Sequence, residues 1–299
     1  MIQNDAMKKI LVPTDFSSCA MKASDVAMQI AGRTNAEVHF YTRVHVHPLW
    51  DSLSEKEKLD FPESMARIQL TRDQFRMLRE RYRGSNVRIV TSFSHGDLVE
   101  VVSRYIDDED IFLIVMGSHG ADGIKEYLFG SNAQKIVRHA HRPVLVIKEG
   151  EVHSDFRSII FASDFQESTK APFKELIEFG RHFGSHIHLV NISTYWSMEQ
   201  RPEIHERMLE FENMCKALPC HIHESGDINI ESGIGRVART INADLVTVAH
   251  FGKKPIRRIF TGSITEALVN HLDIPVLTLN YPELEAWHLK HVSPGERVA

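Results

Sequence analysis

The chain contains one sequence pattern written twice. The stretch ILVPTDFSSCAMKA at residues 10–23 matches IIFASDFQESTKAP at residues 159–172. Each has an apolar run, a small or turn-forming residue, Asp-Phe, and then the start of a helical pattern. Asp15 and Asp164 are therefore equivalent and lie 149 residues apart. Because domains usually hold about 100–200 residues, the repeat predicts two domains of one fold in tandem.

A second match lies nearer the end of each copy. GSHGADGIKEYLFGS begins at Gly117, and AHFGKKPIRRIFTGS begins at Ala249. Four positions agree at an offset of 132 residues: Gly120 with Gly252, Gly130 with Gly262, Ser131 with Ser263, and Pro143 with Pro275. Since the offset falls from 149 to 132, the first copy carries 17 extra residues in its middle. We place them within 46–85, a charged stretch with a helical pattern.

Apolar runs alternate with amphipathic stretches in both copies. The predicted strands of the first copy are 8–13, 37–44, 87–93, 111–117 and 143–147, and the helices between them are 18–33, 53–83, 96–106 and 130–140. The predicted strands of the second copy are 157–163, 186–192, 220–225, 244–249 and 275–279. Short continuous runs of Ile, Val, Leu and Phe are typical of buried parallel strands. The fold class is therefore α/β, with an open parallel sheet covered on both faces in each copy.

The domain boundaries follow from the repeat. We assign 1–150 to the first domain and 151–281 to the second, with a short polar junction at 148–156. Residues 282–299 form a C-terminal tail that has no counterpart in the first copy. Such a tail is either an arm that contacts a partner or a segment without fixed structure.

Composition excludes several classes of protein. The net charge is −5, and neither half has the basic excess of a nucleic-acid-binding protein. The apolar runs are shorter than the roughly 20 residues that span a bilayer, so no membrane partner is expected. The N-terminal stretch lacks the apolar core of a signal peptide, which favours a cytoplasmic location. Three cysteines imply no disulfide framework.

The glycine-rich segment after the fourth strand raises the question of a bound phosphate. If the strand order is 3-2-1-4-5, strands one and four are neighbours at the switch point, and Asp15 faces the segment 117–131 across it. Glycine lets a ligand approach the backbone closely, and the N–H groups that begin the next helix at Gly130 and Ser131 favour an anion. The alternative is that Ser131 is an N-cap and the glycines only form turns.

No motif for catalysis or for metal binding stands out. The loop lacks the Gly-Lys-Ser/Thr of a Walker motif. A dinucleotide-binding fingerprint would place its glycines after the first strand, whereas these follow the fourth. No nucleophile, base and orienting group can be assigned together, so we expect no catalytic residues. CKALPCHIH at 215–223 holds metal-ligand residue types, but His221 and His223 share one strand face while Cys220 takes the other. A structural role is favoured there.

With these residues in view, the chain resembles a tandem universal stress protein. The resemblance rests on ILVPTDFS, IFLIVMGSHG and GSNAQKIVRHAHRPVLVIK in the first copy, and on IIFASDF, ADLVTVAHFG and TGSITEALVNHLDIPVLTL in the second. The family pattern is Gly, two residues, Gly, nine residues, Gly, then Ser or Thr. The first copy satisfies it at Gly117, Gly120, Gly130 and Ser131.

The resemblance implies a Rossmann-like fold with the flavodoxin-like strand order 3-2-1-4-5, and ATP as ligand, with Mg²⁺ as a further candidate. It implies that Asp15 or Asp164 lies beside the nucleotide and that the backbone at Val44 or Ile192 holds the adenine. The phosphates would be wrapped by one of two loops. Their residues are Gly117, Gly120, Gly130, Ser131 and Asn132 in the first copy, and Gly252, Gly262 and Ser263 in the second. It also implies pairing through the last strand, PVLVI or PVLTL, within the chain or in a homodimer.

The two copies depart from the pattern in different ways. Ala249 replaces the first glycine of the second copy, whose loop holds Lys253, Lys254, Arg257 and Arg258, a cluster that suits a triphosphate. The first loop keeps its glycines but carries Asp122 and Glu126, which are unfavourable near phosphates unless Mg²⁺ intervenes. We therefore expect a regulatory ATP-binding protein with little or no turnover. A scaffold without nucleotide and a slow ATP hydrolase are the alternatives.

Overall fold

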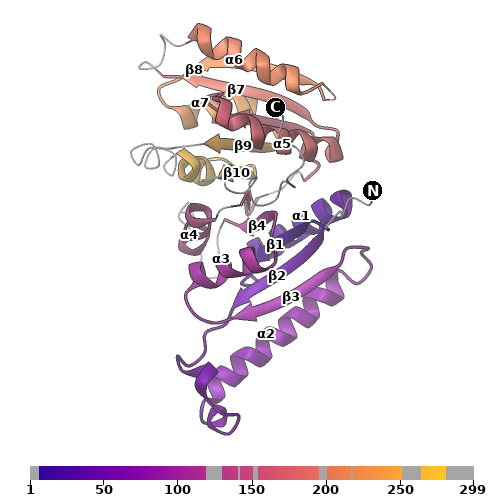
Figure 1. Cartoon of the computed structure of the whole chain (residues 1–299), viewed down its shortest axis with the longest axis vertical. Helices are drawn as coiled ribbons and strands as arrows, with labels where there is room; N and C mark the ends of the chain where they lie inside the picture. The colour runs from indigo at the N-terminus through magenta and orange to yellow at the C-terminus, as the bar shows by residue number, and fades with distance from the viewer. Residues whose placement is uncertain are drawn as a thin grey trace, which may run out of the picture.

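A computed structural model describes residues 7–118, 130–140, 142–150, 154–194, 201–216, 218–250 and 264–280. The described residues contain one ten-stranded sheet, shown edge to edge in Figure 1. The first half contributes β1 (Lys9–Pro13), β2 (Glu37–Arg43), β3 (Ile89–Ser94), β4 (Leu113–Gly117) and β5 (Val144–Ile147). The second half contributes β6 (Ser158–Ala162), β7 (His186–Ser193), β8 (Cys220–Gly226), β9 (Leu245–His250) and β10 (Val276–Asn280).

The strand order is β3-β2-β1-β4-β5-β10-β9-β6-β7-β8. Each half thus has the predicted order 3-2-1-4-5, and its strands pair in parallel. Every predicted strand is present, with boundaries within two residues of the prediction. The halves meet where β5 and β10 pair antiparallel, with Val146 opposite Val276. Because the strands of the two halves run in opposite directions, the carboxyl ends of the first-half strands and those of the second-half strands point to opposite sides of the molecule.

Helices cover both faces of the sheet, as predicted. One face carries α1 (Ser18–Thr34), α2 (Pro62–Arg81), α5 (Lys170–Phe183) and α6 (Arg201–Met214), and the other carries α3 (Leu98–Asp108), α4 (Ser131–His139), α7 (Ile230–Thr240) and a helix at 264–271. In β1, Ile10 and Val12 join the first core while Leu11 joins the second. Burial on both sides explains why the strands are apolar throughout rather than alternating.

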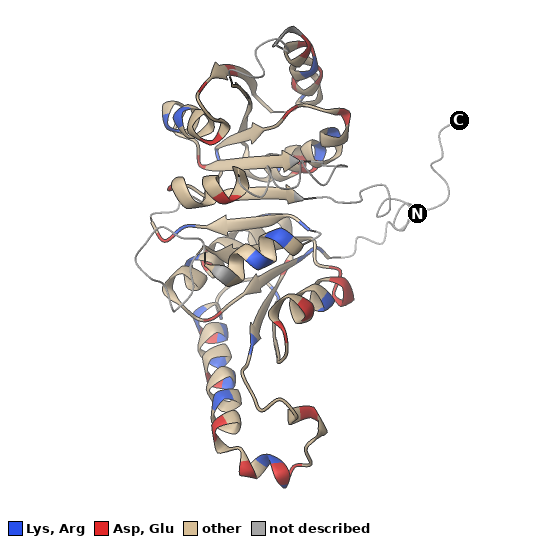
Figure 2. Cartoon of the chain, turned by 90° about the vertical axis from the view of Figure 1, so that its left-hand side faces the viewer, with Lys and Arg blue, Asp and Glu red and all other residues tan. Residues whose placement is uncertain are grey.

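The 46–85 region forms the lower end of the molecule in Figure 1. The predicted helix over 53–83 is wrong at its start, because two 3₁₀ turns, Trp50–Ser52 and Glu57–Asp60, precede α2. Pro62 sets the boundary: proline is favoured in the first turn of a helix and disfavours helical geometry in the residue before it. Phe61 accordingly has φ −118° and ψ 63°. In Figure 2 the ribbon of α2 carries many Lys and Arg positions, and that of the preceding turns carries mainly Asp and Glu positions.

The two halves also touch outside the strand pair. On one face Arg138 of α4 pairs with Glu266 at 2.6 Å. On the other, Arg33 of α1 pairs with Asp155 at 3.0 Å and lies 4.8 Å from the ring centre of Phe183 in α5. The junction is therefore packed on both faces of the sheet. In the part of the chain that the structure describes, none of the helices is both long and apolar enough to span a bilayer.

Candidate functional site

The turn after β1 fixes the carboxylate of Asp15. Thr14 donates its N–H to the carbonyl oxygen of Tyr41 in β2 at 2.8 Å, which continues the strand ladder into the turn. Phe16 donates its N–H to Thr14 Oγ1 at 3.0 Å, and Ser17 donates its N–H to Asp15 Oδ1 at 3.0 Å. Phe16 has φ +62°, an unfavourable value for a residue with a side chain. The turn therefore holds Asp15 in one place, just beyond β1.

The second half builds the same turn after β6. Phe165 has φ +52°, its N–H donates to Ser163 Oγ at 3.0 Å, and the N–H of Gln166 donates to Asp164 Oδ1 at 3.4 Å. Packing holds both strained residues, because Phe16 contacts Phe75 and the buried Phe165 contacts Phe211 edge-on at 5.2 Å. Strained backbone held by its surroundings is frequent at functional sites.

In the first half, the loop after β4 is closed at its base, next to the Asp15 turn that follows β1. β4 lies next to β1, with Ile10 opposite Leu113. Ser118 donates its N–H to the carbonyl oxygen of Ile147 at 2.9 Å and accepts the N–H of Gly130 at 2.9 Å. The intervening residues 119–129, which include Gly120, Asp122 and Glu126, lie outside the described residues. In the second half, Gly252, Gly262, Ser263 and the basic cluster at 253–258 also lie outside them.

Gly117 has a packing role that the sequence did not reveal. A Cβ placed on it would lie 2.9 Å from Cys19 Sγ, 3.0 Å from the carbonyl carbon of Cys19 and 3.1 Å from the nitrogen of Ala20. The first turn of α1 therefore approaches β4 too closely for any side chain at this position. In the second half Ala249 is buried, and the turn Glu167–Thr169 before α5 is a 3₁₀ helix rather than the start of an α-helix. This local change accompanies the methyl group of Ala249.

The helix α4 begins after a glycine N-cap. The N-cap is Gly130, so the alternative in which Ser131 is the N-cap is wrong in that detail. Gly130 has no side chain with which to cap the first N–H groups of the helix. Its φ of −54° does not require glycine. Asn132 is exposed in this first turn. Backbone N–H groups at a helix start are suited to an anion.

The two residues proposed for adenine contact occupy different strand positions. Val44 is buried just past β2 and donates its N–H to the carbonyl oxygen of Ser94 at 2.8 Å. Ile192 lies inside β7 and packs against Gly233, where an added Cβ would come within 2.6 Å of it. Since Pro13 pairs with Tyr41 and Ala162 with Val190, the equivalent of Val44 is Ser193. The strand register therefore shifts the second-half position by one residue.

Lys148 is a buried charged residue that the sequence reasoning missed. It follows β5 and is 8% exposed. Burial lowers the pKa of its ammonium group to about 8, against the smaller opposing effects of Asp273 and Cys19. Its sequence position, directly after a buried strand, was the one available signal, and Asn280 takes the equivalent place after the last apolar run of the second copy.

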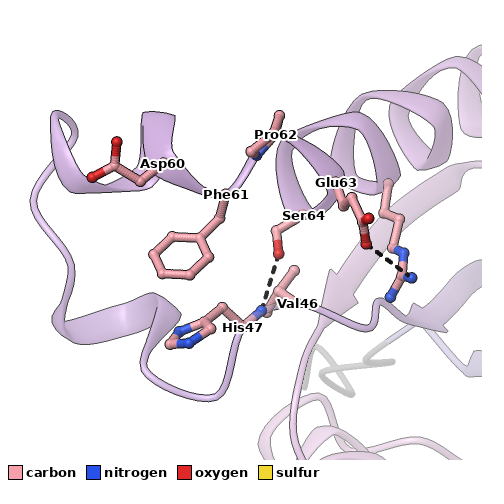
Figure 3. Close-up of a pocket in the computed structure, with 8 residues that line it drawn as sticks. Val46, His47, Asp60, Phe61, Pro62, Glu63 and Ser64 are labelled. Carbon is pink, nitrogen blue, oxygen red and sulfur yellow. Dashed lines mark hydrogen bonds and ion pairs between the residues drawn. The ribbon is translucent and has the colours of Figure 1, made fainter.

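A cavity of about 420 Å³ opens beside the end of β2 (Figure 3). Val46, His47 and Phe61 line it together with the start of α2, and the rings of His47 and Phe61 stack with centres 4.0 Å apart. Ser64 accepts the N–H of His47 at 3.0 Å and so ties the strand exit to the helix. His47 therefore borders the cavity from the β2 side.

Histidines gather on one face of β7 and β8. His188 lies opposite His221, and His188 Nδ1 is 3.0 Å from His223 Nε2. The ring of His186 stacks on that of His221 with centres 6.0 Å apart. Among the described residues, no group of three or more His, Cys, Asp or Glu side chains is arranged to hold a metal ion. The cluster is therefore a set of stacked imidazoles.

The chain is similar to known proteins along most of its length. The model of the universal stress protein family matches residues 7–148 and 155–280. A universal stress protein from Methanocaldococcus jannaschii is 29% identical over 150 residues, covering 48% of this chain and 82% of that protein. A solved universal stress protein from Archaeoglobus fulgidus has a TM-score of 0.73 at 19% identity, covering 91% of this chain and 98% of that one. A solved protein from Pseudomonas aeruginosa, described as a putative universal stress protein, has a TM-score of 0.64 at 16% identity and covers 92% and 93%.

Proposed function

The chain belongs to the universal stress protein family, with family matches in both halves, and from this premise we propose that it binds an adenine nucleotide. The ligand we propose is ATP, with Mg²⁺ as its counter-ion. ATP would act as a regulatory ligand in a stress response, with little or no turnover.

The observation that carries the proposal is the meeting of two features at the ends of neighbouring strands. The strained turn at Asp15 follows β1, and the loop closed by Ser118 and Gly130 follows β4. In open α/β sheets, ligands bind at such a switch point. The start of α4, whose N-cap is Gly130, adds backbone N–H groups and the positive end of a helix dipole, which suit a phosphate.

The proposed roles of the first-half residues follow this geometry. Asp15 would lie beside the sugar and phosphates, or hold Mg²⁺. The loop residues Gly120, Gly130, Ser131 and Asn132 would surround the phosphates. The N–H of Val44 is already engaged by Ser94, so its carbonyl group is the one we assign to the adenine amino group.

The second half has the same turn at Asp164 but a different end to its fourth strand. Gly252, Gly262 and Ser263 would take the phosphate roles there, supported by the nearby basic residues at 253–258. Ile192 was the predicted adenine contact, and the register adds Ser193 as the residue equivalent to Val44. A variant in each half of the full chain, described below, decides whether one half or both bind nucleotide.

Other parts of the proposal concern partners and location. We propose that the two halves act as a pair joined at β5 and β10, and that a homodimer is a further possible assembly. We also propose a cytoplasmic protein with no nucleic-acid or membrane partner. The net charge of −5 supports the absence of nucleic acid.

The test is the nucleotide content and affinity of the purified protein. Nucleotide released on denaturation is identified by ion-exchange chromatography, and Mg-ATP binding is measured by titration calorimetry. Gly130→Asp places a carboxylate at the start of α4, and Gly262→Asp does the same at the matching sequence position. We expect one of them to weaken ATP binding by about tenfold or more, which corresponds to about 1.4 kcal/mol.

The matched control is Gly84→Asp, because a side chain at Gly84 meets nothing within 4 Å. This variant adds the same charge away from either loop and should bind like the wild type. If the wild-type protein neither retains nucleotide nor binds Mg-ATP, the nucleotide proposal is wrong and the scaffold alternative replaces it. Steady ATP turnover that disappears in Asp15→Ala would instead support the slow hydrolase.

A further inference from the structure

Two cysteine thiols lie against each other at the far side of the second half. Cys215 directly follows α6, and Cys220 is the first residue of β8. Their sulfur atoms are 2.8 Å apart. A disulfide bond is about 2.05 Å long, so less than 1 Å of movement separates the two thiols from bonding distance.

The backbone on both sides keeps the pair in place. Cys215 donates its N–H to the carbonyl oxygen of Glu212 at 3.0 Å and accepts the N–H of Leu218 at 2.7 Å. Cys220 lies opposite Ile187 in the β7–β8 ladder, and Ile187 donates its N–H to the carbonyl oxygen of Pro219 at 2.8 Å. The end of α6 and the start of β8 therefore hold the two sulfurs next to each other, and backbone hydrogen bonds fix both positions.

The environments of the two sulfurs differ in access. Cys215 is 1% exposed and belongs to the core that α5 and α6 cover. Cys220 is partly exposed and packs at the edge of the same core. Cys220 is thus the more accessible residue of the two and the one that a small oxidant would meet first, with Cys215 beside it as the resolving thiol.

We propose that Cys215 and Cys220 form a redox-active pair that a hydroperoxide converts into an intrachain disulfide. The Cys220 thiol loses its proton, and its sulfur attacks the peroxide and cleaves the O–O bond. This step gives a sulfenic acid and, with hydrogen peroxide, one water molecule. The sulfur of Cys215 then attacks the sulfenic sulfur, the S–O bond breaks, and a second water leaves. In total two thiols and one hydrogen peroxide become one disulfide and two waters.

The electrostatics of the pair predict how the rate depends on pH. The hydrogen bond with Cys215 raises the pKa of the Cys220 thiol, and burial and the nearby Glu212 raise it further. Because the thiolate is the nucleophile, oxidation is slow at neutral pH and accelerates in alkaline buffer. The pair thus differs from a low-pKa peroxide sensor: it responds to sustained rather than brief exposure.

The disulfide would tie α6 to β8, and α6 reaches the second candidate site. Arg207 of α6 donates from Nη1 to the carbonyl oxygen of Asp164 at 3.5 Å, and Glu210 pairs with Lys170 at 2.8 Å. Oxidation therefore restrains the helix that supports the Asp164 turn. The chemistry itself is independent of nucleotide binding, so its test does not depend on the proposed function.

The experiment is peptide mapping of the full chain after incubation with hydrogen peroxide at pH 7 and pH 9. Remaining thiols are alkylated under denaturing conditions before digestion with trypsin. Lys216 lies between the two cysteines, so a disulfide joins peptide 208–216 to peptide 217–236. We expect this linked product to lack two hydrogen atoms, to disappear on reduction, and to form faster at pH 9.

Cys19 is the internal control. Its sulfur has Ser118 Oγ at 3.9 Å and the Ile147 carbonyl oxygen at 3.6 Å as neighbours, rather than a thiol. It should be recovered alkylated in peptide 10–22. Cys19→Ser should retain the linked peptides, and Cys220→Ser should lose them. If both cysteines of the wild type are instead recovered alkylated, or if Cys220 is found only as sulfinic or sulfonic acid, the proposal is overturned.

Equilibration in mixed reduced and oxidised glutathione removes the dependence on the peroxide rate. A redox-active pair gives the linked peptides in a fraction that rises with the proportion of oxidised glutathione. Formation of only mixed disulfides with glutathione, with no link between the two peptides, would show that the backbone holds the sulfurs apart and would refute the proposal.

Discussion

Gly117 and Ala249 take equivalent places at the ends of two equivalent strands, yet their surroundings differ. At Gly117 the first turn of α1 fills the space where a Cβ would lie, and two of the three nearest atoms belong to backbone. Backbone atoms cannot rotate away as the end of a side chain can. The glycine that best matches a phosphate-binding pattern is thus also demanded by the contact between a strand and a helix.

Gly117→Ala should destabilise the protein by about 1–3 kcal/mol, because the added methyl group pushes α1 away from β4. The measurement is the midpoint of urea unfolding. Ala249→Gly is the matched change in the second half, and it should cost only about 0.5–1 kcal/mol through backbone entropy. Equal stability of Gly117→Ala and the wild type would mean that α1 can shift without cost, and the packing argument would be wrong.

Single residues were the hardest features to predict from sequence. The repeat located Asp15 and Asp164, since each follows an apolar run and precedes a helix. It could not reveal that Ile192 is one position away from the equivalent of Val44, because strand register emerges only when the strands are paired. It also could not reveal the burial of Lys148, which depends on contacts brought together at the junction of the halves.

At the scale of strands, the two halves place different charged and polar groups around an equivalent histidine. In β2, His39 is buried between Glu37, at 2.8 Å, and the hydroxyl group of Tyr105, at 2.9 Å. The equivalent residue in β7 is His188, and the position of Glu37 is taken by His186. The second half thus surrounds a central histidine with imidazoles and lacks the carboxylate that would stabilise its charged form.

The stability of the protein should therefore fall as the pH decreases from about 6.5 to about 4. Burial, followed by repulsion from His223, His221 and His186, lowers the pKa of His188 from 6.5 to about 4. Between these values the unfolded chain binds a proton at His188 and the folded protein does not, so acid favours unfolding. The His188 contribution is complete above pH 6.5 and is lost on approaching pH 4.

The measurement is the melting temperature across this range for the wild type and His188→Asn. The variant lacks the titrating imidazole and should show a shallower acid dependence, with the largest difference from the wild type near pH 4. His182→Asn removes an exposed histidine of α5 and serves as the control, with the wild-type profile expected. Identical pH profiles for His188→Asn and the wild type would contradict the assignment.

Elements as a class were well predicted from sequence, and the reason is their burial. Each strand is covered on both faces, so its residues form an unbroken apolar run that is visible without knowledge of the partner. The 53–83 region was the exception because its charged sequence allows helix throughout, and only the constraint before Pro62 stops it. The helical pattern alone could not distinguish α2 from the 3₁₀ turns before it.

Across the whole molecule, the sheet and both cores run through the junction without interruption. Val146 and Val276 pair there and are both fully buried. Cores on both faces include residues of the two halves. We therefore expect the wild type to unfold in a single calorimetric transition, with the halves cooperating.

Val146→Asp should separate that transition into two, because an unpaired carboxylate buried between the halves costs several kcal/mol. The control is Thr278→Val, which changes a buried residue on the same strand pair and adds no charge. It should keep a single transition. Two transitions in the wild type would show that the halves fold independently. A single transition in Val146→Asp would show that the halves remain coupled without this buried pair, and the argument for the junction would be wrong.

The antiparallel junction has an evolutionary consequence. A symmetric pair assembled from two copies of one chain receives every substitution twice, so its two sites must change together. Here both partners are encoded in one polypeptide, and each can mutate alone. That freedom is visible at equivalent positions of the two halves, where Gly117 corresponds to Ala249 and Glu37 to His186. It is also visible in an insertion that only the first half contains. One half can keep an ancestral task while the other acquires a different one.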